Sequence, residues 1–218
     1  MKYIKCLKTV VLSIMAIGLL LTVVPQTTYA QSKELQKQLD KEYKSTLKRF
    51  KKEGWKLSGS SRSIEVVLLT HYEKLNNPNN QEIVGQVSQC QSINICSQFA
   101  LNNAQVKYAK MASAKMSGDV TTLQRGDAIK KEEIDKFMGA YETAVAADVS
   151  GALSLSFSVV KDNQDGSKSY DSYFIIDGDK AEAARMQALE QSLKETQITA
   201  KDMDEIRKIA KSSVEVTE

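Results

Sequence analysis

The sequence predicts an α+β fold, a small mixed sheet of about four strands with helices packed on it, and three patterns carry this prediction. Apolar residues recur at steps of three and four in several stretches, which is typical of helices with one buried face. The stretch 153–159 alternates apolar residues with serine, as a strand with one buried face does. The stretch 170–177 is apolar on both faces and indicates an interior strand.

The N-terminal part of the chain is predicted to be helical. A long amphipathic helix is expected over 31–53, and Gly54 ends it. A serine-rich connection over 55–63 leads to a second helix over 64–75, which stops at an Asn-Asn-Pro breaker. The apolar residues on one face of the first helix are Leu35, Leu39, Tyr43, Leu47 and Phe50.

The middle of the chain is predicted to alternate strands and helices. A strand is expected at 82–90, a helix at 95–117, a short strand at 120–123 and a helix at 131–147. The helix over 95–117 has a stripe of apolar residues four positions apart: Cys96, Ala100, Ala104, Tyr108, Ala112 and Met116. Its alanines predict that the helix backbone approaches the sheet closely.

The C-terminal part is predicted to be a β-hairpin followed by two helices. Turn residues at 162–166 join the strands 153–159 and 170–177. Asp179 is expected to cap the next helix, and Thr199 with Asp202 three residues later resembles the capping box of the last one.

The first 30 residues have the three parts of a signal peptide. Three lysines precede an apolar run over 10–24, and Thr28 and Ala30 are small residues that signal peptidase accepts. We therefore expect a mature chain that begins at Gln31 and is periplasmic or secreted. A periplasmic chain could also attach peripherally to the outer membrane. The alternative is an uncleaved anchor, which usually needs about 20 apolar residues. The leader cysteine, Cys6, comes before the apolar run, so we do not expect lipidation.

The chain divides into a signal peptide at 1–30, a helical segment at 31–79 and an α+β domain at 80–218, and we expect the last two to fold as one unit. The 30 basic and 27 acidic residues differ by three, and the leader contains three lysines, so the mature chain is nearly neutral. Neutrality argues against nucleic acid as a partner. We expect no integral membrane segment after cleavage of the leader, because no second apolar stretch is long enough.

Cys90 and Cys96 are the candidate disulfide, because they are the only cysteines of the mature chain and export would place them where disulfides persist. The alternative is a pair of buried thiols. Zinc is not expected, since a structural zinc site needs four ligands and only His71 could join the two cysteines.

No catalytic, cofactor-binding or metal-binding signature is present in the sequence. His71 is the sole histidine, so any nucleophilic site that uses a histidine must use it, and a structural role within its helix is the alternative. Three acids near the ends of predicted elements are not paired by anything in the sequence: Glu65, Asp148 and Asp171. Four aromatic residues are candidates for a small-molecule site or for the core: Tyr141, Phe157, Tyr170 and Tyr173.

Two further motifs have plain alternatives. Asp162 and Asp165 are candidate calcium ligands. In an EF-hand alignment, however, Lys161 falls at the first ligand position, so at most weak binding of Ca²⁺ at the surface is expected. The tripeptide 125–127, Arg-Gly-Asp, matches an integrin-type adhesion motif, but chance occurrence at a turn between two elements is the favoured explanation.

One resemblance spans 81–189. The run 82–87, the alanine-rich helix that follows, and the segments 117–120, 157–159 and 173–177 together resemble the small bacterial envelope lipoproteins that include flagellum-associated outer-membrane lipoproteins. The leader and the mature start are also similar to uncharacterised exported proteins of Bacteroidetes. The resemblance implies a non-enzymatic envelope role, and no site residue carries over. The chain departs from the family because it lacks the lipobox cysteine and has an additional helical segment before Asn76.

These observations predict a non-enzymatic exported protein of the cell envelope that acts through protein-protein contacts. The helix over Gln31 to Glu53 is the candidate surface for an envelope partner, and packing on its own domain is the alternative. A secreted hydrolase and a small-molecule binding module are the alternative functions.

Overall fold

The computed structural model describes residues 27–124, 131–196 and 199–215. The chain divides into two units at Gln38, and the contacts discussed below lie within the second unit, Leu39–Glu218. The predicted signal peptide lies almost wholly outside the described residues. Among the described helices, none combines the length and the apolar character that crossing a bilayer requires.

Helices and short strands alternate along the chain before the hairpin. The elements are α2 (Thr27–Glu53), β1 (Lys56–Ser58), α3 (Ile64–Leu75), β2 (Asn80–Cys90), α4 (Ile93–Gln124), α5 (Lys131–Asp148), the 3-10 turn η1 (Val149–Ala152), β3 (Leu153–Asp162), β4 (Lys168–Asp177), α6 (Gly178–Glu195) and α7 (Ala200–Glu215). The α+β class and the long N-terminal helix are confirmed. Gly54, with φ of +76°, follows α2 and turns the chain toward β1.

The four strands form one sheet in the order β1-β3-β4-β2. All three pairings are antiparallel. The sequence predicts a mixed sheet, and this part of the prediction is wrong. β4 has a partner on both sides, and its residues Tyr170–Ile176 are all buried, which confirms the interior position that its apolar pattern predicts.

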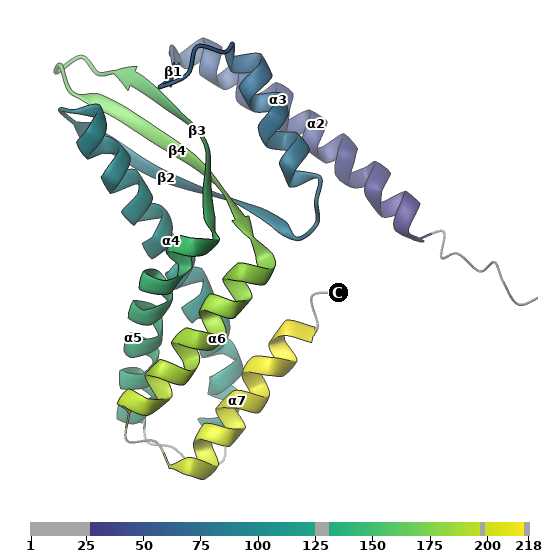
Figure 1. Ribbon diagram of the computed structural model, residues 1–218, viewed down its shortest axis with the longest axis vertical. Coiled ribbons are helices and arrows are strands. Elements are labelled where there is room, and N and C mark those ends of the chain that lie inside the picture. The colour runs from purple at the N-terminus through teal and green to yellow at the C-terminus, as the bar shows by residue number, and fades with distance from the viewer. Residues whose placement is uncertain (1–26, 125–130, 197–198, 216–218) are drawn as a thin grey trace, which may run out of the picture. The chain divides into compact units, whose positions relative to one another are not determined.

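Helices cover both faces of this sheet (Figure 1). On one face, Phe50 of α2 and His71 of α3 contact the stacked pair Phe157 and Tyr173. On the other face, the N-terminal half of α4 lies on β2 and β4, where Cys96, Ala100 and Tyr170 share a buried cluster. The larger core joins that face to the bundle of α4, α5, α6 and α7.

Three local predictions are wrong for identifiable reasons. Residues 120–123 are helical, because the four-residue spacing of α4 continues from Met116 to Val120, which is fully buried. The serine-rich connection contains the short edge strand β1, which pairs with β3. The cap of α6 is Asp177, whose side chain accepts a hydrogen bond from Lys180 N, and Asp179 lies inside the helix because β4 leads directly into α6.

Thr199 and Asp202 bond to each other at the start of the last helix, as their spacing predicts, and form one of the two backbone bonds of a capping box. The backbone N of Asp202 donates to Thr199 Oγ1 at 3.4 Å, and the two side chains bond at 2.5 Å. α7 begins at the next residue after this threonine and brings Ile206 and Ala210 into the larger core. This places α7 beside α4 and α6, where it closes one wall of the cleft described next.

Candidate functional site

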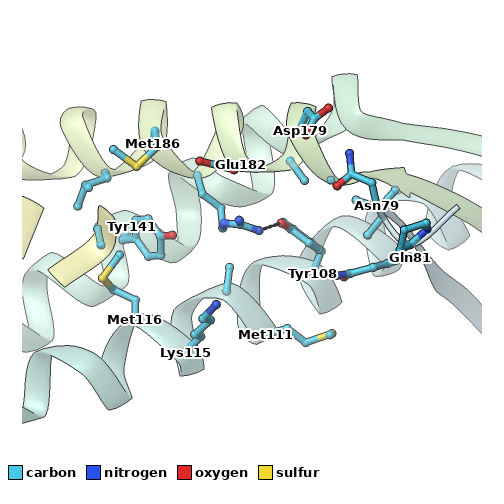
Figure 2. Close-up of a pocket in the computed structure, with 18 residues that line it drawn as sticks. Asn79, Gln81, Tyr108, Met111, Lys115, Met116, Tyr141, Asp179, Glu182 and Met186 are labelled. Carbon is cyan, nitrogen blue, oxygen red and sulfur yellow. Dashed lines mark hydrogen bonds between the residues drawn. The ribbon is translucent and has the colours of Figure 1, made fainter. Parts of the chain in front are cut away.

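A cleft of about 400 Å³ lies where the helical bundle meets the ends of β2 and β4. α4 and α6 supply most of its walls, α5 and α7 supply one residue each, and the chain before β2 closes one end (Figure 2). The lining residues are Pro78, Asn79, Gln81, Tyr108, Met111, Ala112, Lys115, Met116, Tyr141, Ile176, Gly178, Asp179, Ala181, Glu182, Arg185, Met186, Leu189 and Ala210. Its volume lies within the range of about 300–1,000 Å³ that is typical of small-molecule pockets.

The closed end depends on a close approach between Gly178 and Asn79. The backbone N of Gly178 donates to the Asn79 carbonyl oxygen at 2.9 Å. A Cβ atom on Gly178 would lie 2.7 Å from the Asn79 carbonyl oxygen, a backbone atom that cannot move aside, so the start of α6 requires a glycine. This contact fixes the first turn of α6 against the turn that precedes β2.

Arg185 and Tyr108 form the polar centre of the cleft. The guanidinium Nη1 donates a hydrogen bond to Tyr108 Oη at 2.6 Å, which is the dashed line in Figure 2. Tyr108 is buried on α4 and Arg185 is half-buried on α6, so this bond spans the cleft between the two helices. No ion pair joins Arg185 to an acidic residue in the described part of the chain, although Glu182 lies one turn earlier on α6.

Tyr141 is the third polar group of this centre. It comes from α5 and points into the same space as Tyr108 (Figure 2). Only 1% of its surface is exposed to solvent. Within the described ranges, its hydroxyl forms no hydrogen bond with another side chain. Burial raises the pKa of Tyr141 to about 12, while nearby Arg185 acts in the opposite direction, so the hydroxyl keeps its proton at neutral pH.

The rest of the lining combines apolar side chains with amide and charged groups. Met116 and Met186 lie beside Tyr141, and Met111, which is exposed, lies farther along α4 (Figure 2). Methionine side chains are flexible and polarisable, so they adapt to ligands of different shape. The charged residues around the centre are Lys115, Asp179 and Glu182, together with Arg185.

The cleft has features of a binding site and lacks a catalytic set among the described residues. It contains no histidine, serine or cysteine, and its two acids have no partner that would make either one a general acid or base. Nowhere in the described ranges do three or more His, Cys, Asp or Glu residues converge as metal ligands. The arrangement can hold and orient a ligand.

His71 lies on the other side of the sheet and is fully buried, which is deeper than the surface or partly buried position expected for it. Its Nε2 bonds Glu82 Oε2 at 2.6 Å. Its ring makes edge contacts with Tyr72, Phe157 and Tyr173 at centroid distances between 5.2 and 6.0 Å. The Nδ1 atom is also buried and has no partner in the described structure. The bond between His71 and Glu82 therefore connects α3 to β2. Because the imidazole ring is fully buried, a substrate cannot reach it.

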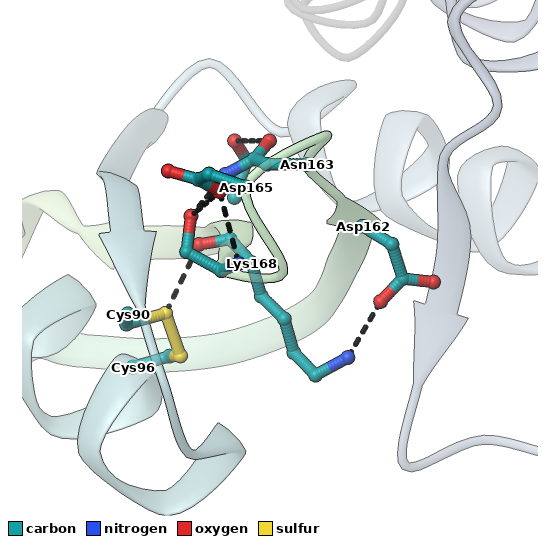
Figure 3. Close-up of polar contacts among 8 residues, drawn as sticks. Cys90, Cys96, Asp162, Asn163, Asp165 and Lys168 are labelled. Atoms are coloured by element: carbon teal, nitrogen blue, oxygen red, sulfur yellow. Dashed lines mark hydrogen bonds and ion pairs between the residues drawn. A yellow bond between two sulfur atoms is a disulfide. The ribbon is translucent and has the colours of Figure 1, made fainter.

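The predicted disulfide is present and joins Cys90 at the end of β2 to Cys96 in the first turn of α4, with the Cα atoms 5.6 Å apart (Figure 3). Cys90 Sγ lies 3.3 Å from the carbonyl oxygen of Lys168. A disulfide sulfur carries no proton, so this is a packing contact between the bridge and the hairpin. The bridge therefore fixes the corner where strand, helix and hairpin meet.

The acidic hairpin turn is occupied by its own hydrogen bonds (Figure 3). The Asp165 carboxylate accepts from the Oγ and the N of Ser167, and these bonds lower its pKa. The hydrogen bond and ion pair with Lys168 lower the pKa of Asp162. Both carboxylates thus have structural roles in the turn, and the described residues offer no calcium ligand set there.

The remaining predicted candidates are dispersed. Glu65 pairs with Lys51, Asp171 bonds Gln86 at 3.4 Å on β2, and Asp148 Oδ2 is buried at the end of α5. The Arg-Gly-Asp tripeptide at 125–127 lies outside the described residues. Of the four aromatic candidates, Phe157 and Tyr173 pack under α2 and α3, Tyr170 packs beside the disulfide, and only Tyr141 lines the cleft.

Sequence reasoning missed Arg185 and assigned Tyr108 to the core. The stripe on α4 correctly places Tyr108 on the inner face, but it does not show that a cavity lies beside its hydroxyl. Arg185 is one of 30 basic residues, so composition does not single it out. Its position could have done so, because it follows Ala184 on a face of α6 whose other residues are mostly buried alanine and leucine.

No protein-family model matches the chain, and no curated protein or solved structure is significantly similar to it. Function must therefore be inferred from the geometry and chemistry of the chain itself.

Proposed function

We propose that the protein is an exported, non-enzymatic binding protein that holds a small molecule in the cleft between α4 and α6. The observation that carries this proposal is the cleft itself, where Tyr108, Tyr141 and Arg185 converge in a lining that combines apolar and polar side chains. A concave apolar site with a few convergent polar groups is the usual form of a small-molecule site.

Binding is favoured over hydrolysis by the placement of the titratable groups. The sole histidine is enclosed on the opposite side of the sheet, and the acids named by sequence reasoning lie on separate elements. A hydrolase built on carboxylates needs two acids around one reaction centre, or an acid with a nucleophile. Glu182 and Asp179 both lie on α6 near the cleft, and neither has such a partner in the lining.

Methionine methyl groups allow a direct test. The mature chain contains five methionines, of which Met111, Met116 and Met186 line the cleft, while Met138 and Met203 lie elsewhere in the bundle. The protein labelled with 13C-methyl methionine would be titrated with a library of small aromatic and aliphatic fragments. We expect binding fragments to shift the three cleft signals and to leave the other two nearly unchanged. If no fragment moves the cleft signals, or if all five move together, the cleft is not the binding site.

Export is proposed from the leader and is tested separately. Mass spectrometry of the natural protein should give a chain that begins at Gln31, recovered outside the cytosol. Natural protein that retains residues 1–30, or that fractionates with cytosolic proteins, would contradict export without bearing on the cleft. The disulfide is consistent with an oxidising compartment.

Contact with an envelope protein is a second candidate function, and exposed apolar side chains favour it. Four of them lie in the first turns of α4 with 38–54% of their surface exposed: Ile93, Ile95, Phe99 and Leu101. The predicted contact helix at 31–53 is partly committed to its own domain, since Leu39 and Phe50 are buried. Pull-downs with Phe99→Ser and with a chain lacking residues 31–38 would test the two surfaces. Unchanged partners for both variants would exclude this function.

A further inference from the structure

We propose that the cleft selects ligands that carry a carboxylate on a compact apolar body, with the carboxylate bound by Arg185, Tyr108 and Tyr141. This inference rests on the proposed binding function and names its ligand class. It follows from the hydrogen-bonding inventory of the three side chains and from the lining around them.

Arg185 has donors available for a ligand. A guanidinium has five N–H donors, and the described structure uses one of them, for Tyr108 Oη. Arg207 of α7 provides a comparison: it pairs with Glu190 at 2.8 and 2.9 Å and with Asp204 at 3.0 Å. Arg185 lacks such a carboxylate among the described residues, and the planar fork of an arginine is matched by a carboxylate.

The two tyrosines add donors to the same point. Because Tyr108 Oη accepts a hydrogen bond from Arg185, its own proton is free to be donated elsewhere. The side chain of Tyr141 is buried, and its hydroxyl forms no hydrogen bond in the described part of the chain and stays protonated at neutral pH. The centre therefore presents donors from three side chains, and a group with several acceptor lone pairs and a negative charge satisfies them together.

The lining sets the body of the ligand. Met116, Met186 and Ile176 surround the donors with apolar surface, and the cleft of about 400 Å³ admits a compact body. Burial of this body contributes to affinity in proportion to the apolar area that leaves water. A carboxylate without an apolar body would leave this surface wet.

The acids on α6 distinguish this ligand class from its competitors. Glu182 and Asp179 lie toward the same cleft, so they repel an anionic ligand and attract a cationic one. If the ligand is a carboxylate held at Arg185, removal of the Glu182 charge strengthens binding. If the ligand is a cation or is held by its ammonium group, the same change weakens binding.

Three probes with one body test the head group: 4-phenylbutyrate, 4-phenylbutanol and 4-phenylbutylamine. Affinity for the full mature protein at pH 7 would be measured by titration of the cleft methionine signals. We expect the acid to bind at least about tenfold more tightly than the alcohol. We expect Arg185→Gln to abolish this preference, Tyr141→Phe to weaken acid binding several-fold, and Glu182→Gln to strengthen it. Arg207→Gln is the control, because it removes an arginine charge outside the cleft.

The outcomes separate this inference from the proposed function. Equal binding of acid and alcohol, or an acid preference that survives in Arg185→Gln, overturns the carboxylate inference and leaves a cleft that binds apolar molecules. Tightest binding of the amine, weakened by Glu182→Gln, overturns it in favour of cationic ligands. Failure of all three probes and of the fragment library to shift the cleft methionines overturns both. Melting temperatures of each variant show whether a lost preference reflects loss of folding.

Discussion

The strand residue Gly85 lies directly beneath Ala100 of α4, so closely that a Cβ atom on Gly85 would be 1.8 Å from the Ala100 carbonyl oxygen. Ala100 is fully buried, and β2 and α4 make one of the most extensive contacts of the domain. The alanine stripe of α4 predicts a close approach to the sheet, and this pair confirms it. The approach requires a small residue on the helix and no side chain at all on the strand.

Gly85→Ala should therefore destabilise the domain. The added methyl group meets helix backbone, which cannot move aside as a side chain can, so we expect a loss of about 3 kcal/mol, at the upper end of overpacking effects. For a chain of this length that corresponds to a fall in melting temperature of roughly 6–12 °C. Gly139→Ala is the matched control. Gly139 is an exposed helical glycine with no atom within 4 Å of an added Cβ, and alanine there should stabilise by up to about 1 kcal/mol.

Removal of the disulfide should destabilise the domain modestly. In the chain-entropy model a loop closed between cysteines six residues apart contributes about 2 kcal/mol, so Cys90→Ala with Cys96→Ala should lower the melting temperature by roughly 4–8 °C. Calorimetry with and without dithiothreitol provides the check. The reductant should lower the melting temperature of the natural protein and leave the double variant unaffected; a natural protein that is insensitive to the reductant would show that the bridge adds nothing to stability.

Phe50→Ala should detach the end of α2 from the sheet. Phe50 has no exposed surface and contacts Phe157 and Tyr173, so its truncation should cost about 3–5 kcal/mol. Its neighbour Lys51 provides the control, because its ion pair with Glu65 is exposed and should contribute less than about 1 kcal/mol. Urea unfolding of both variants compares the two residues. Equal losses would mean that α2 is held by surface charge and not by the aromatic cluster.

Asp171 should make the domain less stable as pH rises. The side chain is 4% exposed, and burial raises the pKa of its carboxyl above the usual 3.8, against the hydrogen bond from Gln86. A raised folded-state pKa means that the folded chain binds the proton more tightly than the unfolded chain does. Stability is therefore greatest below the unfolded pKa and decreases as pH rises through the folded pKa.

The substitution Asp171→Asn removes this pH dependence. We expect the variant to be more stable than the natural protein at pH 7, with a difference that shrinks as pH falls toward 3, measured by urea unfolding across this range. Asp162→Asn should show the opposite sign, because Lys168 lowers the pKa of Asp162 and that stabilising contribution is lost as pH falls. If Asp171→Asn lowers stability at pH 7, attraction to Arg49 and Lys161 outweighs the burial of the charge.

Most of the fold could be predicted from periodicity, and its failures have local causes. Periodicity predicts the hairpin strands and all six helices from α2 to α7, because each shows a clear period. The sequence predicts a strand at 120–123 because a short apolar run fits either period and Gly118 is a weak helix former just before it. β1 has three residues, too few for an alternating pattern, and depends on its pairing with β3.

The candidate site could not be predicted in the same way. Tyr108, Tyr141 and Arg185 come from three helices separated by loops of unspecified geometry, and each has the pattern of an ordinary inward-facing residue. Periodicity tells which face of a helix is buried, but a cavity arises from the crossing of helices and from side-chain volumes across them. The sequence names only Tyr141 of these three, as one of four aromatic candidates. Outside the cleft, the disulfide could be assigned in advance because Cys90 and Cys96 are close in sequence.

The single bridge also shapes how the chain matures. Once the predicted leader and its Cys6 are removed, two cysteines remain, so disulfide formation has one possible product and no mispaired isomers to resolve. Both partners lie in the first half of the chain, and closure can occur as soon as residue 96 meets an oxidant, before the hairpin and the last helices are present. Maturation of this protein should therefore require a thiol oxidase but no disulfide isomerase.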